Sequence, residues 1–221
     1  MIELLRSRLF WLDMARLQVG LFLFGLAIAL MLEARIGLDP WSAFHEVVSR
    51  RSGWSFGRIS QTTGLVVILL SRIVLSVRPG IATILNMLLI GPWVDVLRPF
   101  VGFADGFGVG VIQFLLAVPI LGMGTAIYIG ASLGAGPRDG LAMGLSRRIQ
   151  KSLRVSRIGV EVAVLTAAAL LGGSIGWGTV LFAVLMGPTM QACLRLFRVS
   201  HDPSPTFRRY GVRPPHAGGF G

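Results

Sequence analysis

The chain has 221 residues, of which 53% are hydrophobic and only 14% are charged, and its mean hydropathy is +0.73. This composition lies outside the range of soluble globular domains and is typical of an integral membrane protein. A formal net charge of +11 would suggest nucleic-acid binding in a soluble chain. Here Arg and Lys cluster at the ends of apolar segments, where they orient the chain in a membrane, so nucleic acid is not an expected partner.

Six apolar segments follow one another along the chain, and each comes close to the length of about 20 residues that a spanning helix needs. The predicted spans are residues 15–34, 58–77, 81–97, 109–131, 156–172 and 179–197. A short helix is predicted after the first span, over 41–51, and another after the fourth, over 138–150. Both are too short to span, and the expected fold is an all-α integral membrane protein.

The two halves of the chain repeat one pattern of residues. Gly37 and Pro40 recur 97 residues later as Gly134 and Pro137, and the triplet Ser-Arg-Arg at 49–51 recurs at 146–148. Further matches, at an offset of 96 residues, pair Gly80, Thr83, Gly91 and Pro92 with Gly176, Thr179, Gly187 and Pro188. A dozen matches in the same order indicate a duplication. Because each unit holds three spans, the second unit would enter the membrane from the opposite side, as in the inverted-topology repeats of many secondary transporters.

This repeat divides the chain into five parts. They are an N-terminal segment (1–14), a first membrane unit (15–97), a connecting loop (98–108), a second membrane unit (109–198) and a basic, disordered tail (199–221). With both termini in the cytoplasm, the cytoplasmic segments hold 16 of the 21 Lys and Arg residues. This excess of positive charge on one side supports cytoplasmic termini and six spans.

Each unit contains a Gly-Pro loop that leads into its short helix, and these loops hold most of the candidate site residues. Asp39 and Pro40 begin the first short helix, while Pro137, Arg138 and Asp139 begin the second. If the loops re-enter the membrane, the two helix N-termini approach the midplane, and an anionic group would be favoured there with Arg138 as its partner.

The alternative is that each short helix lies flat in the headgroup layer. Trp41, Phe44 and Val48 share one face of the first short helix, as in an interfacial amphipathic helix. Asp39 would then be only an N-cap, with Pro40 at the first helical position. The residues favour the interfacial helix slightly over the re-entrant one. In either case Gly136 is expected to need a positive φ in its turn.

Glu161 is the remaining candidate, because it is an ionisable residue inside an apolar segment. Arg157 stands four residues earlier on the same predicted helix, so the two side chains can form an ion pair at the cytoplasmic boundary. We favour this ion pair as the role of Glu161, and a functional role at membrane depth is the alternative.

The sequence contains no complete enzyme motif. His45 and Glu46 begin like a zinc-protease helix, but Ser49 stands where the second histidine is required. The single cysteine, Cys193, excludes an intramolecular disulfide and a cysteine-based metal cluster. We therefore expect no enzymatic activity, no metal and no cofactor.

The loop Gly37 to Trp41, the later loop Gly134 to Asp139, and the pairs Gly178-Thr179 and Gly187-Pro188 together resemble the bacterial YczE/YyaS-type membrane proteins related to the YitT group. The resemblance covers about residues 15–198. It implies a multi-pass protein of the bacterial plasma membrane and names no biochemical activity. This chain has Trp41 where the second loop has Arg138, so any anion site would be asymmetric.

The leading expectation is a small-solute transporter or permease, with an anionic solute as one option, whose site lies between the two repeats. The alternative is a non-transporting membrane scaffold that recruits a cytoplasmic partner through the basic segment 147–157 and the tail. The expected partners are the lipid bilayer and an unidentified small solute, and homo-oligomer formation is left open.

Overall fold

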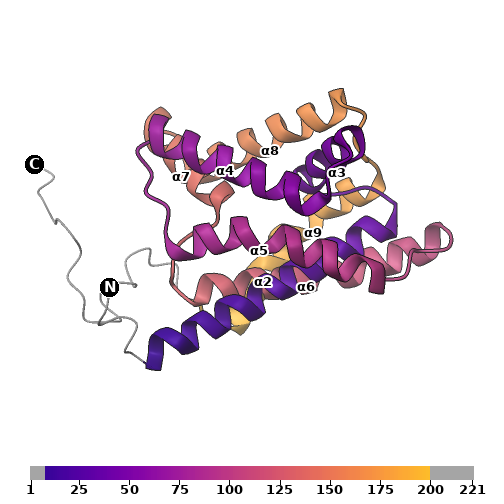
Figure 1. The fold of residues 1–221 in the computed structure, drawn as a ribbon, viewed down its shortest axis with the longest axis horizontal. Helices are drawn as coiled ribbons and strands as arrows, with labels where there is room; N and C mark the ends of the chain where they lie inside the picture. The colour runs from indigo at the N-terminus through magenta and orange to yellow at the C-terminus, as the bar shows by residue number, and fades with distance from the viewer. Residues whose placement is uncertain (1–7, 200–221) are drawn as a thin grey trace, which may run out of the picture.

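The computed structural model describes residues 8–199, and this part of the chain is helical throughout, without strands (Figure 1). The helices, in chain order, are α2 (Arg8–Ala34), α3 (Pro40–Ser52), α4 (Phe56–Val74), α5 (Ile81–Leu97), α6 (Phe107–Gly130), α7 (Pro137–Ile149), α8 (Leu153–Leu170) and α9 (Trp177–Leu196). A 3-10 turn, η1 (Arg98–Phe100), follows α5 directly. The predicted tail, apart from its first residue, and the first seven residues lie outside the described range.

Every predicted helix is present, and most ends agree within three residues. The exception is α2, which begins at Arg8 rather than at residue 15. An ion pair of 3.2 Å between Asp13 and Arg16, one helical turn apart, accompanies this earlier start. The predicted short helices at 41–51 and 138–150 correspond to α3 and α7.

Four helices are long and apolar enough to cross a membrane on their own. They are Arg8–Ala34, Ile81–Phe100, Phe107–Gly130 and Trp177–Leu196. The other two predicted spans form the helices α4 and α8 but are less apolar, since α4 contains Arg58 and Arg72 and α8 contains three charged residues, Arg154, Arg157 and Glu161. The protein is thus an all-helical integral membrane protein with four strong spans among the described residues.

The core is built around α2, which packs along α6 and also against α5 (Figure 1). Small residues allow the closest approach between α2 and α6. A Cβ atom on Gly20 would lie 2.7 Å from the backbone nitrogen of Tyr128, and one on Gly124 would lie 2.8 Å from that of Phe24. Glycine on both helices therefore lets their backbones meet, as in many membrane helix pairs.

The two Gly-Pro loops have matching backbone geometry. Gly37 and Gly134 both have φ of +123°, a conformation that favours glycine, and each is preceded two residues earlier by a non-glycine residue with φ near +55°. The short helices that follow begin with Pro40 and Pro137 at the first helical position. Matched sequence thus gives matched local structure in the two halves.

Each loop is held by the last long helix of the other half. The Thr179 hydroxyl at the start of α9 donates to the Leu38 carbonyl over 2.8 Å, and the Gly178 N–H donates to the Ile36 carbonyl over 2.7 Å. At the matching positions, the Thr83 hydroxyl at the start of α5 donates to the Ala135 carbonyl over 2.6 Å. The two halves therefore interlock at these loops.

Candidate functional site

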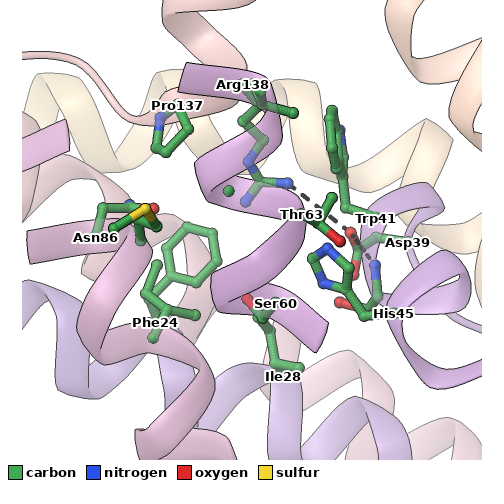
Figure 2. A pocket seen from close by; sticks show the side chains of 15 residues that line it. Phe24, Ile28, Asp39, Trp41, His45, Ser60, Thr63, Asn86, Pro137 and Arg138 are labelled. Atoms are coloured by element: carbon green, nitrogen blue, oxygen red, sulfur yellow. Dashed lines mark hydrogen bonds and ion pairs between the residues drawn. The ribbon is translucent and has the colours of Figure 1, made fainter. Parts of the chain in front are cut away.

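A cavity of about 60 Å³ lies between the beginnings of α3 and α7 (Figure 2). Its wall comes from five helices, α2, α3, α4, α5 and α7, together with the N-cap of α3, so both halves of the chain contribute to it. The lining residues labelled in Figure 2 are Phe24, Ile28, Asp39, Trp41, His45, Ser60, Thr63, Asn86, Pro137 and Arg138. Apolar and aromatic walls with a few polar groups are typical of a small-molecule site.

Asp39 enters the cavity as the N-cap of α3. Its Oδ2 accepts a hydrogen bond from the Ser42 backbone N–H over 3.2 Å, which satisfies one of the free N–H groups at the helix start. The same oxygen lies 3.8 Å from Nη1 of Arg138. The sequence interpretation of Asp39 as an N-cap is therefore correct, but the residue also faces the other half of the protein.

Arg138 enters the cavity from the first turn of α7. Its guanidinium lies 5.0 Å from the centre of the Phe24 ring and is held there by a cation–π contact. Besides Asp39, it interacts electrostatically with Glu161 and Asp139. Arg138 is therefore a partly buried cation that already faces several carboxyl groups.

Asp139, the next residue of α7, belongs to a neighbouring cluster rather than to the cavity wall. The Tyr128 hydroxyl donates to Asp139 Oδ2 over 2.9 Å, and Arg157 Nη2 lies 3.1 Å from Asp139 Oδ1. These contacts tie α7 to α6 and α8. Asp139 thus anchors the helix start that carries Arg138.

The expected ion pair between Arg157 and Glu161 is replaced by a different arrangement. Arg157 reaches across to Asp139 on α7, because α7 packs against α8. Glu161 is half-buried and lies within electrostatic range of both Arg138 and Arg157. Glu161 therefore belongs to the surroundings of the cavity.

Three residues that line the cavity each carry a buried polar atom without a hydrogen-bond partner within the described residues. These atoms are Asp39 Oδ1, Trp41 Nε1 and His45 Nε2. Their residues are 3%, 8% and 9% exposed, and all three line the cavity. An unpaired buried polar atom costs about 1–3 kcal/mol, so such atoms gathered in one cavity indicate a place where a ligand or water supplies the missing partners.

The structure brings most of the predicted site residues together. Asp39, Pro137 and Arg138 line the cavity, and Pro40 is buried at the start of α3. Gly136 is the N-cap of α7 with φ of −63°, so the expectation of a positive φ there is wrong. The residue of this loop with a positive φ is Gly134, at +123°, two residues before the N-cap.

The first turns of the first short helix are covered by other parts of the protein. Trp41 from its apolar side and Ser42 and His45 from its polar side are all buried. α3 packs against α4 and α8. The beginning of the helix is therefore enclosed within the protein, whereas Arg50 and Arg51 at its end are exposed.

Several lining residues were missed at the level of sequence. Trp41 was assigned to an interfacial face, and His45 was considered only as a metal ligand. Asn86 could have been identified from the sequence, because it is the one amide side chain within the predicted span 81–97. Ser60 and Thr63 carry no such signal, since small hydroxyl residues are common in membrane helices.

A second cavity, of about 180 Å³, lies on the other side of the first Gly-Pro loop. Gly37 and Leu38 line this second cavity, while Asp39, the next residue, lines the first. Its wall also includes the charged residues Arg35, Glu46 and Arg98. Arg98 Nε donates to Glu33 Oε1 over 2.6 Å beside this cavity.

Comparison with known proteins places the chain in a family. Residues 12–195 match a family described as a family of unknown function, DUF6198. The chain belongs to this family. Among its relatives, the uncharacterized membrane protein YczE of Bacillus subtilis strain 168 is 33% identical over 176 residues, which cover 79% of this chain and 82% of YczE.

Two further relatives match over a similar extent. An uncharacterized protein of Haemophilus influenzae is 31% identical over 185 residues, 83% of this chain and 84% of the relative. The uncharacterized protein YyaS of Bacillus subtilis is 22% identical over 173 residues, 76% of this chain and 86% of YyaS. No solved structure matches the chain. The resemblance drawn from the Gly-Pro loops is thus confirmed.

Proposed function

We propose that this protein is a transporter or permease of the bacterial plasma membrane that moves a small solute and has no catalytic step. Its binding site is the cavity between α3 and α7. One observation carries the proposal: two matching loops, one from each half, bring Asp39 and Arg138 to a cavity whose lining residues carry three buried polar atoms without partners in the part of the chain that the structure describes. Sites of this kind, at the interface of two repeats, are found in many secondary transporters.

The proposal includes six spans in two inverted repeats, with both termini in the cytoplasm. The helices α4 and α8, which are the less apolar candidates, expose large apolar side chains, among them Leu69 and Ile73 on α4 and Ile158 and Val162 on α8. Such surfaces are covered most readily by lipid. The reciprocal contacts of the two loops also support a duplicated unit.

The loops supply a second line of support. Irregular backbone is tolerated at membrane depth only where its polar groups are paired inside the protein. The carbonyls of Ile36, Leu38, Leu133 and Ala135 all accept hydrogen bonds from the start of a helix in the other half. These loops therefore meet the condition for re-entering the membrane, which supports re-entrant helices over interfacial ones.

The second cavity offers a route toward the site. It is lined by charged residues and is separated from the first cavity by the short loop at residues 37–39. In the proposed topology it opens on the outer side, so movement of this loop would connect the outside with Asp39. Transport would then require a complementary opening beside Asp139 on the cytoplasmic side.

The test is uptake of labelled small solutes into liposomes that contain the purified protein. We expect faster entry of at least one solute than in protein-free liposomes, and a loss of that entry in Arg138→Gln. Arg147→Gln is the matched control, because Arg147 is exposed at the end of the same helix. Entry at the protein-free rate for every solute would overturn the proposal and leave a scaffold role. Unchanged uptake in Arg138→Gln would move the site elsewhere.

A further inference from the structure

The charges around the cavity restrict the kind of solute that fits it. Arg138, the cation on its wall, is already opposed by Asp39 and interacts with Asp139 and Glu161. A solute anion would have to compete with these carboxyl groups for the same guanidinium. The site therefore lacks the uncommitted positive charge that anion binding favours.

The atoms without partners point to the opposite kind of group. Asp39 Oδ1 is a carboxylate oxygen, which accepts hydrogen bonds, and Trp41 Nε1 is an N–H that only donates. His45 lines the same cavity, and its Nε2 can donate or accept according to the tautomer of the ring. The complementary solute carries an N–H donor for Asp39 and an acceptor for Trp41.

Aromatic rings favour a positive charge on that donor. The rings of Trp41, Phe24 and His45 all line the cavity, and the Trp41 and His45 rings have their centres 6.3 Å apart. The face of a Trp or Phe ring attracts cations, most strongly when the cation is removed from water. The Phe24 ring already makes a cation–π contact with Arg138. The Trp41 ring is therefore the one proposed to contact a cationic solute.

We infer that the ligand of this cavity is a small amine, whose ammonium group binds Asp39 and whose acceptor group binds Trp41. The inference rests on the proposed function, since it names the substrate class of the same site. Because about 10–15 Å³ of such volume holds one water, a cavity of about 60 Å³ has room for roughly four to six non-hydrogen atoms. The ligand is therefore no larger than a short amino acid or amino amide.

Three probes of equal size test whether the cavity prefers a cationic, a zwitterionic or an anionic ligand. Glycinamide is the cation, glycine the zwitterion and glycolate the anion. Each is added at constant ionic strength to the purified full chain in detergent, and the unfolding temperature is measured. We expect glycinamide to raise the unfolding temperature most, glycine to raise it less, and glycolate to leave it unchanged. Stabilisation by glycolate equal to that by glycinamide would overturn the inference, and so would a lack of response to all three.

Variants of Asp39 and Trp41 test whether glycinamide binds in this cavity. Asp39→Asn keeps the shape of the side chain and is expected to weaken glycinamide binding roughly tenfold or more, the cost of losing one charge-assisted hydrogen bond. Asp105→Asn, at an exposed position between α5 and α6, is the matched control and should bind as the unmodified protein does. Should Asp39→Asn fail to fold, Trp41→Phe keeps an aromatic ring and removes the N–H together with the five-membered ring of the indole, with an expected loss of about fivefold or more. Unaltered glycinamide affinity in the folded variant would overturn the inference.

Uptake measurements keep this inference apart from the proposed function. Glycinamide that binds in an Asp39-dependent manner but does not enter liposomes would retain the ligand class and reject transport. Uptake of a solute without an amine, unaffected by glycinamide, would retain transport and reject the ligand class.

Discussion

Asp39 Oδ2 and Arg138 Nη1 lie 3.8 Å apart, close enough for strong attraction but beyond hydrogen-bond distance. The two residues begin the two short helices, one in each half of the chain. Each also has a second contact that fixes it, the Ser42 N–H for Asp39 and the Phe24 ring for Arg138. The two side chains are thus fixed in position but do not hydrogen-bond each other. A ligand group could therefore bind to one of them without first breaking a hydrogen bond between them.

Neutralising both members of this pair should destabilise the protein by less than the sum of the two single changes. Asp39→Asn leaves Arg138 with one carboxyl partner fewer, and Arg138→Gln leaves a buried carboxylate facing an amide. We expect each single variant to lose about 1–3 kcal/mol of unfolding free energy and the double variant to lose less than the sum. Thermal unfolding of the four proteins in detergent measures this coupling. Strictly additive losses would show that the two side chains act independently.

Gly134 should tolerate substitution less well than Gly136. Gly134 has φ of +123°, where an alanine is strained, and its new Cβ would lie 3.1 Å from Gly80 Cα. Gly136 has φ of −63°, and its new Cβ would meet the Tyr128 hydroxyl at 3.3 Å. We expect Gly134→Ala to cost about 1–3 kcal/mol and Gly136→Ala clearly less, measured as folded protein after heating. The reverse order would mean that contact with Tyr128, rather than backbone strain, limits this loop.

The contact between α2 and α6 should be sensitive to one added methyl group. In Gly124→Ala the new carbon would lie 2.8 Å from the Phe24 backbone nitrogen, so the helices must separate. We expect a loss of about 1–3 kcal/mol, typical of overpacking. Gly108→Ala, near the start of the same helix, is the control, because its new carbon has no neighbouring atom within 4 Å. Equal stability of the two variants would contradict the close packing of α2 and α6.

Reporter fusions test the orientation. Fusions at both ends and after Arg147 should report from the cytoplasm, and a fusion after Arg50 from the outside, because the cytoplasmic segments hold most of the positive charge. Alkaline phosphatase and a fluorescent protein give opposite signals at each position. An external signal from the C-terminal fusion would contradict six spans.

Sequence alone predicted the helices well because Gly and Pro mark their ends. Pro137 and Pro40 each stand at a helix start, as their fixed φ and missing N–H dictate. The offset of the repeat identified Gly37 and Gly134 as matching positions, and their backbone conformations agree. Which glycine of the second loop adopts the left-handed conformation was not predictable, because Gly134 and Gly136 are equally free to do so.

Side-chain partners were harder to predict than helices. Arg157 stands four residues from Glu161 but contacts Asp139, since the packing of α7 on α8 is a tertiary property that local spacing does not encode. The burial of Trp41 and His45 was missed for the same reason. A helix with polar residues on several sides looks like a surface helix until a neighbouring helix is known to cover it.

The hydrogen bond from Thr179 to the first loop affects the order in which the protein is assembled. The carbonyl groups of Ile36 and Leu38 accept hydrogen bonds from Gly178 and Thr179, near the beginning of the last long helix. A membrane protein is synthesised and inserted from its N-terminal end, so these two carbonyls cannot form the bonds to α9 until nearly the whole membrane region is made. The cavity is therefore completed among the last events of assembly, and a nascent chain halted before α9 would have no finished site.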